Sequence, residues 1–311
     1  MSPRVSLGLP VYNGSEYVGA ALESLLRQTY SDYEIVISDN ASTDDTEKLC
    51  RDYERRDPRI RYSRNDRNRG VAYNFRKVFE LSSGEYFKWV VHDDVCDPTY
   101  IAKCVEVLDA APPSVVLCYP KTILIDSHGA EIELYEDRMD LRQPRPSQRL
   151  EHLYRYLHLC HCGLGLIRSD VLRKTRLIDG FERSDVVLLV ELALAGFFYE
   201  HPEYLYRRRV HAQNSFQNYT TPAAYDERMD PANRGRYAMP RTRLFIESLR
   251  SISRAPIGAW EQLCCAMALL RVWGPRFWRV VGGECKGLLR HQLRRAAGRL
   301  GAGSPPGVQS V

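Results

Sequence analysis

The first 120 residues alternate short apolar runs with amphipathic segments, and this alternation constrains the fold more than any other feature. Between the runs, apolar side chains recur at helical spacing, as at Val18, Leu22 and Leu25. Strands that alternate with helices imply right-handed crossovers and a mostly parallel sheet with helices on both faces. The sequence therefore predicts an α/β, Rossmann-like fold. The apolar runs are residues 5–9, 33–38, 59–63, 89–91 and 115–119.

Polar residues follow several of these runs at the edge where a parallel sheet binds ligands. The fourth run ends on two adjacent carboxylates, Asp93 and Asp94. Their repulsion must be relieved by solvent, as in an exposed turn, by a cation or by a raised pKa. The chain has no GxGxxG or GxxxxGK[ST] phosphate loop. An apolar strand that ends on Asp-Asp therefore suggests Mg²⁺ or Mn²⁺ bound together with a diphosphate.

Composition indicates an ordinary globular chain of 311 residues with 44% hydrophobic residues and a net charge of +5. Residues 240–311 carry twelve Lys or Arg and three acids, so the excess of positive charge belongs to the tail. No run approaches the roughly 18 to 20 apolar residues of a membrane-spanning helix, and the N-terminus lacks the apolar core of a secretory signal. Nine scattered cysteines without a CxxC pair indicate reduced thiols. We therefore expect a cytoplasmic protein.

Several ordered motifs together resemble the inverting family 2 glycosyltransferases of the GT-A fold. They are the run from residue 5 to 46, "NRGVAYN" at 68–74 and "GEYFKWVVHDDVCDP" at 84–98. The resemblance implies transfer of a sugar from a nucleotide-diphosphate sugar to an acceptor hydroxyl, with Mn²⁺ or Mg²⁺ as cofactor. It also implies a GT-A catalytic domain at 1–220. Spacing and composition predict a helical, basic region at 221–300 and a disordered tail at 301–311.

Within the catalytic domain, the resemblance places the nucleotide sugar on residues 1–120 and the acceptor and base on 121–220. It implies that Tyr12, beside Pro10 and Asn13, packs its ring on the nucleobase; a half-buried turn tyrosine is the alternative. Asp39 and Asn40 match a pair that is usually Asp-Asp and contacts the base. Because Asn40 carries an amide in place of the usual acid, the nucleobase of the donor could be uracil, thymine or guanine.

Two further groups of residues are implied to approach the donor. Arg69, Gly70 and Asn74 lie in the "NRGVAYN" motif, where glycine permits close backbone contact and Arg69 could equally be a solvated loop residue. Arg209 and His211, with Arg208 beside them, resemble an R-x-H loop that closes on the diphosphate. The alternative for these arginines is a plain charged surface.

The metal is implied to bind Asp94, with Asp93 on the ribose or sugar, although the two roles could be exchanged. Val91 stands where many relatives carry the first acid of a DxD motif, so the pattern is the shorter Asp-Asp version. His92 is a further ligand candidate, or a hydrogen-bonded residue at the strand end.

The resemblance implies that Asp185 is the catalytic base, at the start of a helix, with Ser184 in place of the usual preceding acid. The alternative for Asp185 is an acid favoured by the helix dipole. As base, it would accept the proton of the acceptor hydroxyl in a single displacement that inverts the anomeric centre.

Four other interpretations compete with this one. A zinc site at Cys160, His161 and Cys162 lacks the usual two-residue loop, so these residues are expected in the core or the acceptor pocket. A glycoside hydrolase needs two separated carboxylates. A nucleotidyltransferase normally has a basic, glycine-rich first loop, whereas "LPVYNGSEY" has no Lys or Arg. A non-catalytic GT-A-like module that binds nucleotide sugars remains open because of Val91, Asn40 and Ser184.

The basic tail has helical spacing over residues 256–300, with possible breaks at 273–275 and 281–284. Residues 286–299 contain five Lys or Arg and no acid. The basic tail has three alternative roles: peripheral contact with the inner face of the membrane, packing on the catalytic domain, or self-association. Nucleic acid is not expected as a partner. The acceptor could be a polysaccharide, a lipid-linked group or a natural product, with a role in cell-envelope or polysaccharide biosynthesis. The apolar stripe of this tail is Leu289, Leu293, Ala297 and Leu300.

Overall fold

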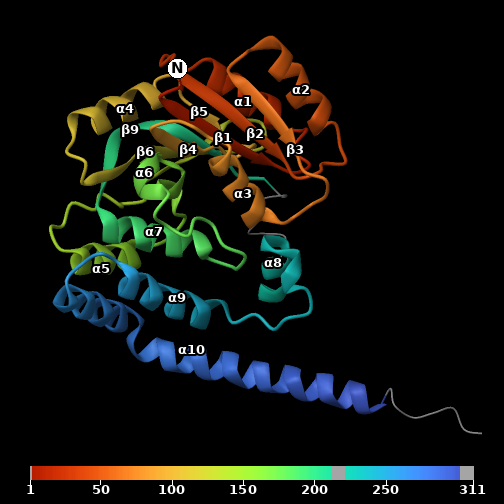
Figure 1. The fold of residues 1–311 in the computed structure, drawn as a ribbon, viewed down its shortest axis with the longest axis vertical. Helices are drawn as coiled ribbons and strands as arrows, with labels where there is room; N and C mark the ends of the chain where they lie inside the picture. The colour runs from red at the N-terminus through yellow and green to blue at the C-terminus, as the bar shows by residue number, and fades with distance from the viewer. Residues whose placement is uncertain (1, 212–220, 302–311) are drawn as a thin grey trace, which may run out of the picture.

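A computed structural model describes residues 2–211 and 221–301 of the chain. Its centre is one mixed sheet with strand order β3-β2-β1-β4-β8-β6-β9-β5, and β7 pairs with β6 outside this path. Helices cover both faces of the sheet, and α9 and α10 extend along one end of the molecule (Figure 1). The strands are β1 Val5–Val11, β2 Tyr33–Asp39, β3 Ile60–Arg64, β4 Tyr86–Trp89, β5 Val95–Cys96, β6 Val115–Ile125, β7 Glu131–Tyr135, β8 Leu166–Arg168 and β9 Phe197–Arg209.

The helices of the first half fall where the amphipathic segments predicted them. Strands β3, β2, β1 and β4 pair in parallel, as their helical crossovers require. Beyond β4 the sheet is mixed: β8 pairs antiparallel with both β4 and β6, whereas β6 and β9 pair in parallel. The helices are α1 Val18–Leu26, α2 Thr46–Arg56, α3 Val71–Glu80, α4 Tyr100–Ala110, α5 Pro146–Tyr156, α6 Ser169–Leu172, α7 Ser184–Ala195, α8 Pro222–Met229, α9 Pro240–Arg254 and α10 Ala259–Gly301, with 3₁₀ turns η1 His161–Leu164 and η2 Pro231–Asn233.

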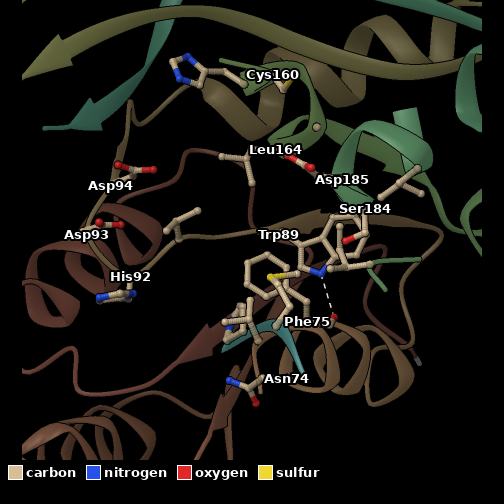
Figure 2. A pocket seen from close by; sticks show the side chains of 18 of the residues that line it. Asn74, Phe75, Trp89, His92, Asp93, Asp94, Cys160, Leu164, Ser184 and Asp185 are labelled. Atoms are coloured by element: carbon tan, nitrogen blue, oxygen red, sulfur yellow. Dashed lines mark hydrogen bonds between the residues drawn. The ribbon is translucent and has the colours of Figure 1, made fainter. Parts of the chain in front are cut away.

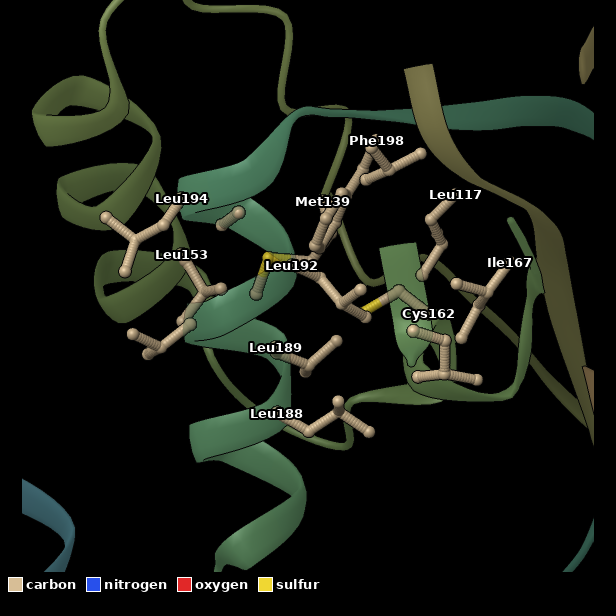
Figure 3. Packing of buried hydrophobic residues seen from close by; sticks show 14 of the residues in the cluster. Leu117, Met139, Leu153, Cys162, Ile167, Leu188, Leu189, Leu192, Leu194 and Phe198 are labelled. Carbon is tan, nitrogen blue, oxygen red and sulfur yellow. The ribbon is translucent and has the colours of Figure 1, made fainter. Parts of the chain in front are cut away.

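Helix α7 is buried on nearly every side, and this fixes the position of its first turn. Its leucines pack against Leu153 of α5 on one side and against Ile167 and Phe198 of the sheet on the other (Figure 3). The same apolar cluster contains Phe245 of α9 and Leu269 of α10. The inner faces of the C-terminal helices therefore share a core with the sheet domain.

Three local expectations need correction. The capping-box spacing of Ser42 and Asp45 predicts a helix start at Ser42. The Ser42 hydroxyl instead donates to the Asp39 carboxylate, and α2 begins only at Thr46. Apolar residues have helical spacing over 149–163, which predicts a helix there, but α5 ends at Tyr156. Of the two breaks expected in the tail, only the first exists: α10 kinks at Gly274 and continues through 281–284.

All nine cysteines are free thiols and most of them are buried. Among residues 2–211 and 221–301, no helix combines the length and the apolar character that crossing a bilayer requires. The expected disordered tail lies, apart from residue 301, outside the described residues.

Candidate active site

A cavity of about 280 Å³ opens at the carboxyl ends of β1 and β4, between the sheet and helices α7 and α8. His92, Asp93 and Asp94 lie on one side of it, and Ser184 and Asp185 lie on the other (Figure 2). Segments far apart in the sequence thus meet at one site. The predicted site residues that line it are Pro10, Tyr12, Asn40, Asn74, Asp93, Asp94 and Asp185.

Amide side chains build the floor of the cavity. The Nδ2 of Asn74 donates to the carbonyl oxygens of Val11 and Ser38, and so ties the ends of β1 and β2 together. The Nδ2 of Asn40 donates to Asn68 Oδ1 at 2.9 Å and to the Gly70 carbonyl at 3.1 Å. Its Oδ1 accepts from the Arg69 amide at 3.0 Å. Asn40 therefore shapes the "NRG" loop with both ends of its amide.

Asp39 does not reach the cavity, because protein groups surround its carboxylate completely. One oxygen accepts from the Ser42 amide and hydroxyl, and the other accepts from the Tyr62 hydroxyl at 2.6 Å. Asn13 is also engaged locally: its backbone is left-handed, with φ 49°, and its Oδ1 accepts from the Thr43 amide. Both residues hold the loops that carry Tyr12, whose own side chain is 43% exposed.

Gly70 and Arg69 lie at the edge of the floor and do not line the cavity. Gly70 has φ 88°, and a Cβ placed on it would lie 2.5 Å from the carbonyl oxygen of Met229. The close backbone approach that the glycine permits is therefore to the end of α8. Arg69 forms an ion pair with Asp66 and lies over the ring of Tyr73.

The two adjacent carboxylates differ in their surroundings. Asp94 accepts from the Tyr206 hydroxyl and from the Arg209 amide at 2.8 Å, and Asp93 lies 2.9 Å from His211 Nε2. Burial, and then the charge of Asp93, raise the pKa of Asp94 to about 7. A cation beside the pair would relieve both the burial cost and the repulsion.

Alternation along β9 separates the three consecutive arginines. Arg208 lines the cavity, whereas Arg209 turns to the far side, where its guanidinium donates to the Asp93 carbonyl and lies over the Tyr17 ring. Arg207 pairs with Glu131 at the surface. Arg209 thus supports the Asp-Asp turn from behind, and Arg208 is the arginine of the three that faces the cavity. The two-residue period of a strand was the signal that could have chosen between them.

His161 fixes Arg208 in this position, a contact that the sequence did not reveal. Arg208 Nη1 lies 2.6 Å from His161 Nε2, and His161 Nδ1 lies 3.0 Å from Thr122 Oγ1. Because a guanidinium can only donate, Nε2 accepts and the imidazole proton sits on Nδ1. Burial, followed by the charge of Arg208, lowers the pKa of His161 well below its usual value, so the ring is neutral.

Asp185 occupies the first turn of α7 and is reached by solvent through the cavity. The surrounding protein walls limit its hydration, and this desolvation raises the pKa of its carboxyl group above the usual value. Arg183 precedes the helix in a left-handed conformation with φ 66°. The buried Ser184 hydroxyl also lines the cavity and finds no hydrogen-bond partner among the described residues.

A buried lysine beneath the site was also missed by sequence reasoning. Lys88, fully buried, donates to the Leu164 carbonyl and lies over the rings of Tyr100 and Tyr206. Desolvation lowers its pKa. Tyr206 in turn donates to Asp94, so Lys88 braces the underside of the carboxylate site. A single lysine directly before the apolar run 89–91 was the only available signal.

The match to a family model decides the family. The model for glycosyl transferase family 2 matches residues 6–176, which is more than half of the chain. The chain belongs to glycosyl transferase family 2. It is 30% identical to an uncharacterized glycosyltransferase of Rickettsia typhi over 68% of this chain and 65% of that protein. It is 26% identical to the chondroitin synthase of Escherichia coli over 68% of this chain and 30% of that protein. This family 2 chain thus spans slightly less than two thirds of the Rickettsia relative.

Solved structures confirm the GT-A fold. S. aureus TarS in complex with UDP-GlcNAc superposes with a TM-score of 0.65 and 15% identity, covering 88% of this chain and 73% of that one. The mannosyltransferase PcManGT of Pyrobaculum calidifontis, solved with GDP-Man and Mn²⁺, superposes with a TM-score of 0.56 and 16% identity. The match covers 98% of this chain and 82% of that one. The chain therefore has the GT-A fold, followed by a helical C-terminus.

Proposed function

We propose that this glycosyltransferase is metal-dependent and inverting, and that it moves a sugar from a nucleotide-diphosphate sugar to an acceptor hydroxyl. The observation that carries the proposal is that the Asp93 and Asp94 pair and Asp185 lie on opposite sides of one cavity (Figure 2). One side can hold the leaving diphosphate while the other receives a proton. The fold relatives solved with UDP-GlcNAc and with GDP-Man and Mn²⁺ support this division.

The carboxylates fit a hard divalent cation. Each oxygen of Asp94 accepts one hydrogen bond from the protein and keeps a lone pair for a further partner. Among the described residues, no three His, Cys, Asp or Glu side chains form a metal-binding group. Mn²⁺ or Mg²⁺ at Asp94 would therefore complete its coordination with diphosphate oxygens and water. When bound, it would offset charge that develops on the leaving diphosphate.

The remaining side chains of the cavity have separate tasks in this proposal. Tyr12 offers its half-exposed ring to the nucleobase. Arg183, Arg208 and Arg228 line the cavity and supply positive charge to the diphosphate. Asp185 accepts the proton of the attacking hydroxyl, and its raised pKa suits it to hold that proton.

The proposal also assigns a task to each part of the chain. Residues 1–120 bind the nucleotide sugar, residues 121–220 bind the acceptor and supply the base, and residues 221–300 form the helical region. We place the reaction in the cytoplasm, where nucleotide sugars are available to make polysaccharide or cell-envelope products.

A panel of donors tests the proposal. UDP-, dTDP- and GDP-sugars would be incubated with Mn²⁺, with Mg²⁺ or with a chelator, and release of nucleoside diphosphate would be measured. We expect release with one class of donor only when metal is present, and NMR of the product should show the opposite anomer. Metal-independent binding without turnover of any donor would favour a non-catalytic module, and a product with retained configuration would exclude the inverting mechanism.

A further inference from the structure

Helix α10 exposes a long apolar face that packing on the domain does not use. The side chains before the kink recur at spacings of three, four and three residues, and those after it lie on one face of the helix. The two tryptophans, Trp260 and Trp278, are 72% and 71% exposed. The exposed apolar residues of α10 on this face are Trp260, Leu263, Met267, Leu270, Trp278, Leu289 and Leu293.

The two halves of this face meet at the kink. Leu270 from the first half and Trp278 from the second line one shallow apolar hollow, together with Trp273 and Phe277. The backbone turn at Gly274 thus brings the two rows together at this hollow. The helix itself runs along the end of the molecule (Figure 1).

The charges of α10 are sorted between its two sides. Its acids turn toward the domain: Glu261 accepts from the Ser147 amide at 2.9 Å, and Glu284 accepts from the Thr242 amide at 3.0 Å. Its exposed cations have no ion pair among the described residues. These cations are Arg271, Arg279, Lys286 and Arg290.

We propose that this face of α10, the seven apolar residues with the four cations beside them, docks on an anionic membrane surface. Exposed tryptophan and leucine beside Lys and Arg match the boundary between headgroups and acyl chains. The spacing before the kink would also suit a coiled-coil seam. A second copy, however, would bring equal positive charge to the seam, whereas anionic lipid neutralises it.

The proposed docking is in the plane of the membrane. No described helix is long and apolar enough to cross it, and the buried side of α10 remains packed on α5 and α9. The proposal does not depend on the sugar-transfer reaction, because the face is formed by α10 alone.

Vesicle co-sedimentation of the full chain tests it, with phosphatidylcholine vesicles that either contain or lack phosphatidylglycerol. We expect binding only to the anionic vesicles. The double variant Trp260→Ala, Trp278→Ala should weaken binding about tenfold or more. The triple variant Arg279→Glu, Lys286→Glu, Arg290→Glu should weaken it at least about 100-fold, since each cation contributes near the surface.

Two control variants match these changes elsewhere on the surface. Ile132→Ser with Leu134→Ser removes exposed apolar groups from β7. Arg27→Glu, Lys48→Glu and Lys174→Glu makes the same change in net charge at exposed sites away from α10. Both controls should bind anionic vesicles within about threefold of the wild type.

The outcomes separate the alternatives. The proposal would be overturned if the wild type did not bind anionic vesicles, or if the control variants lost as much vesicle binding as the α10 variants. So would a stable dimer in sedimentation velocity that dissociates on tryptophan replacement while vesicle binding is unchanged. Donor turnover in solution should be unaffected by the α10 variants, so failure here and failure of the proposed reaction are distinguishable.

Discussion

The floor and the wall of the cavity use polar side chains in opposite ways. Asn40 and Asn74 on the floor, and Asp39 outside the cavity, direct their hydrogen-bonding groups to the protein itself. On the wall, Asp185 is open to the cavity and Ser184 has no described partner. The floor is therefore a frame that sets the backbone, whereas the wall presents groups that a substrate can use.

The difference predicts which substitutions damage stability and which damage chemistry. Replacing a floor residue leaves buried donors or acceptors without partners, which costs free energy of unfolding. Replacing a wall carboxylate should leave the fold intact and remove a step of the reaction.

The largest expected effect is on the wall. Asp185→Asn should lower turnover by about 10²-fold to 10⁴-fold, because the proton of the attacking hydroxyl loses its acceptor. Donor affinity and thermal stability should change little. Steady-state turnover and calorimetric binding of the donor with Mn²⁺ would check both statements.

A matched control distinguishes the base from a helix-dipole acid. Asp170 is exposed and occupies the first turn of α6, as Asp185 does in α7, but it does not line the cavity. Asp170→Asn should keep normal turnover. Equal activity of both variants would refute the assignment of the base.

Asp94→Asn should abolish metal-dependent donor binding. It should also change how the free energy of unfolding depends on pH. Because burial raises the pKa of Asp94 to about 7, the folded metal-free protein holds a proton that the unfolded chain releases above about pH 4. The wild type should therefore lose free energy of unfolding relative to Asp94→Asn as pH rises from about 4 to about 7. Urea unfolding of both proteins across that range, without metal, measures the difference. If the free energies of unfolding of the two proteins changed in parallel with pH, the raised pKa of Asp94 would be contradicted.

Asn40→Asp sharpens the comparison, because it restores the acid pair usual in the family. In this chain it should lower the free energy of unfolding by about 1–3 kcal/mol. The new carboxylate would face Asn68 Oδ1 and the Gly70 carbonyl, which now accept hydrogen bonds from Nδ2. Chemical denaturation checks this, and a gain in stability would show that the amide is not required for the loop.

Gly70→Ala should have an effect of similar size, a loss of about 1–3 kcal/mol of unfolding free energy from the positive φ and the contact with Met229. Gly235→Ala is the matched control, since Gly235 has φ 71° with nothing within 4 Å of the added Cβ. Thermal unfolding of both should show the larger loss at Gly70. Equal losses would mean that the contact with Met229 costs nothing.

The sequence predicted the framework of the site because that framework is periodic. Alternating strands and helices placed Tyr12, Asp93 and Asp94 at one edge of the sheet, and the family resemblance placed Asp185 at the start of a helix. The structure brings all four to one cavity. The family membership and the GT-A fold were likewise predictable from ordered motifs.

Tertiary contacts decided what the sequence could not show. Asp39 is enclosed because Tyr62 reaches it from β3. Arg208 faces the cavity in place of Arg209 because of its side of β9, and His161 holds it there from a distant turn. No local pattern encodes these contacts, although strand alternation could have favoured Arg208.

The most direct test of the account is anomalous diffraction from a crystal of the protein grown with Mn²⁺ and a nucleoside diphosphate. The account predicts a manganese peak within coordination distance, about 2.2 Å, of an Asp94 oxygen, with the diphosphate on the same ion and the base beside Tyr12. A diphosphate bound elsewhere, with no manganese beside Asp93 or Asp94, would contradict it.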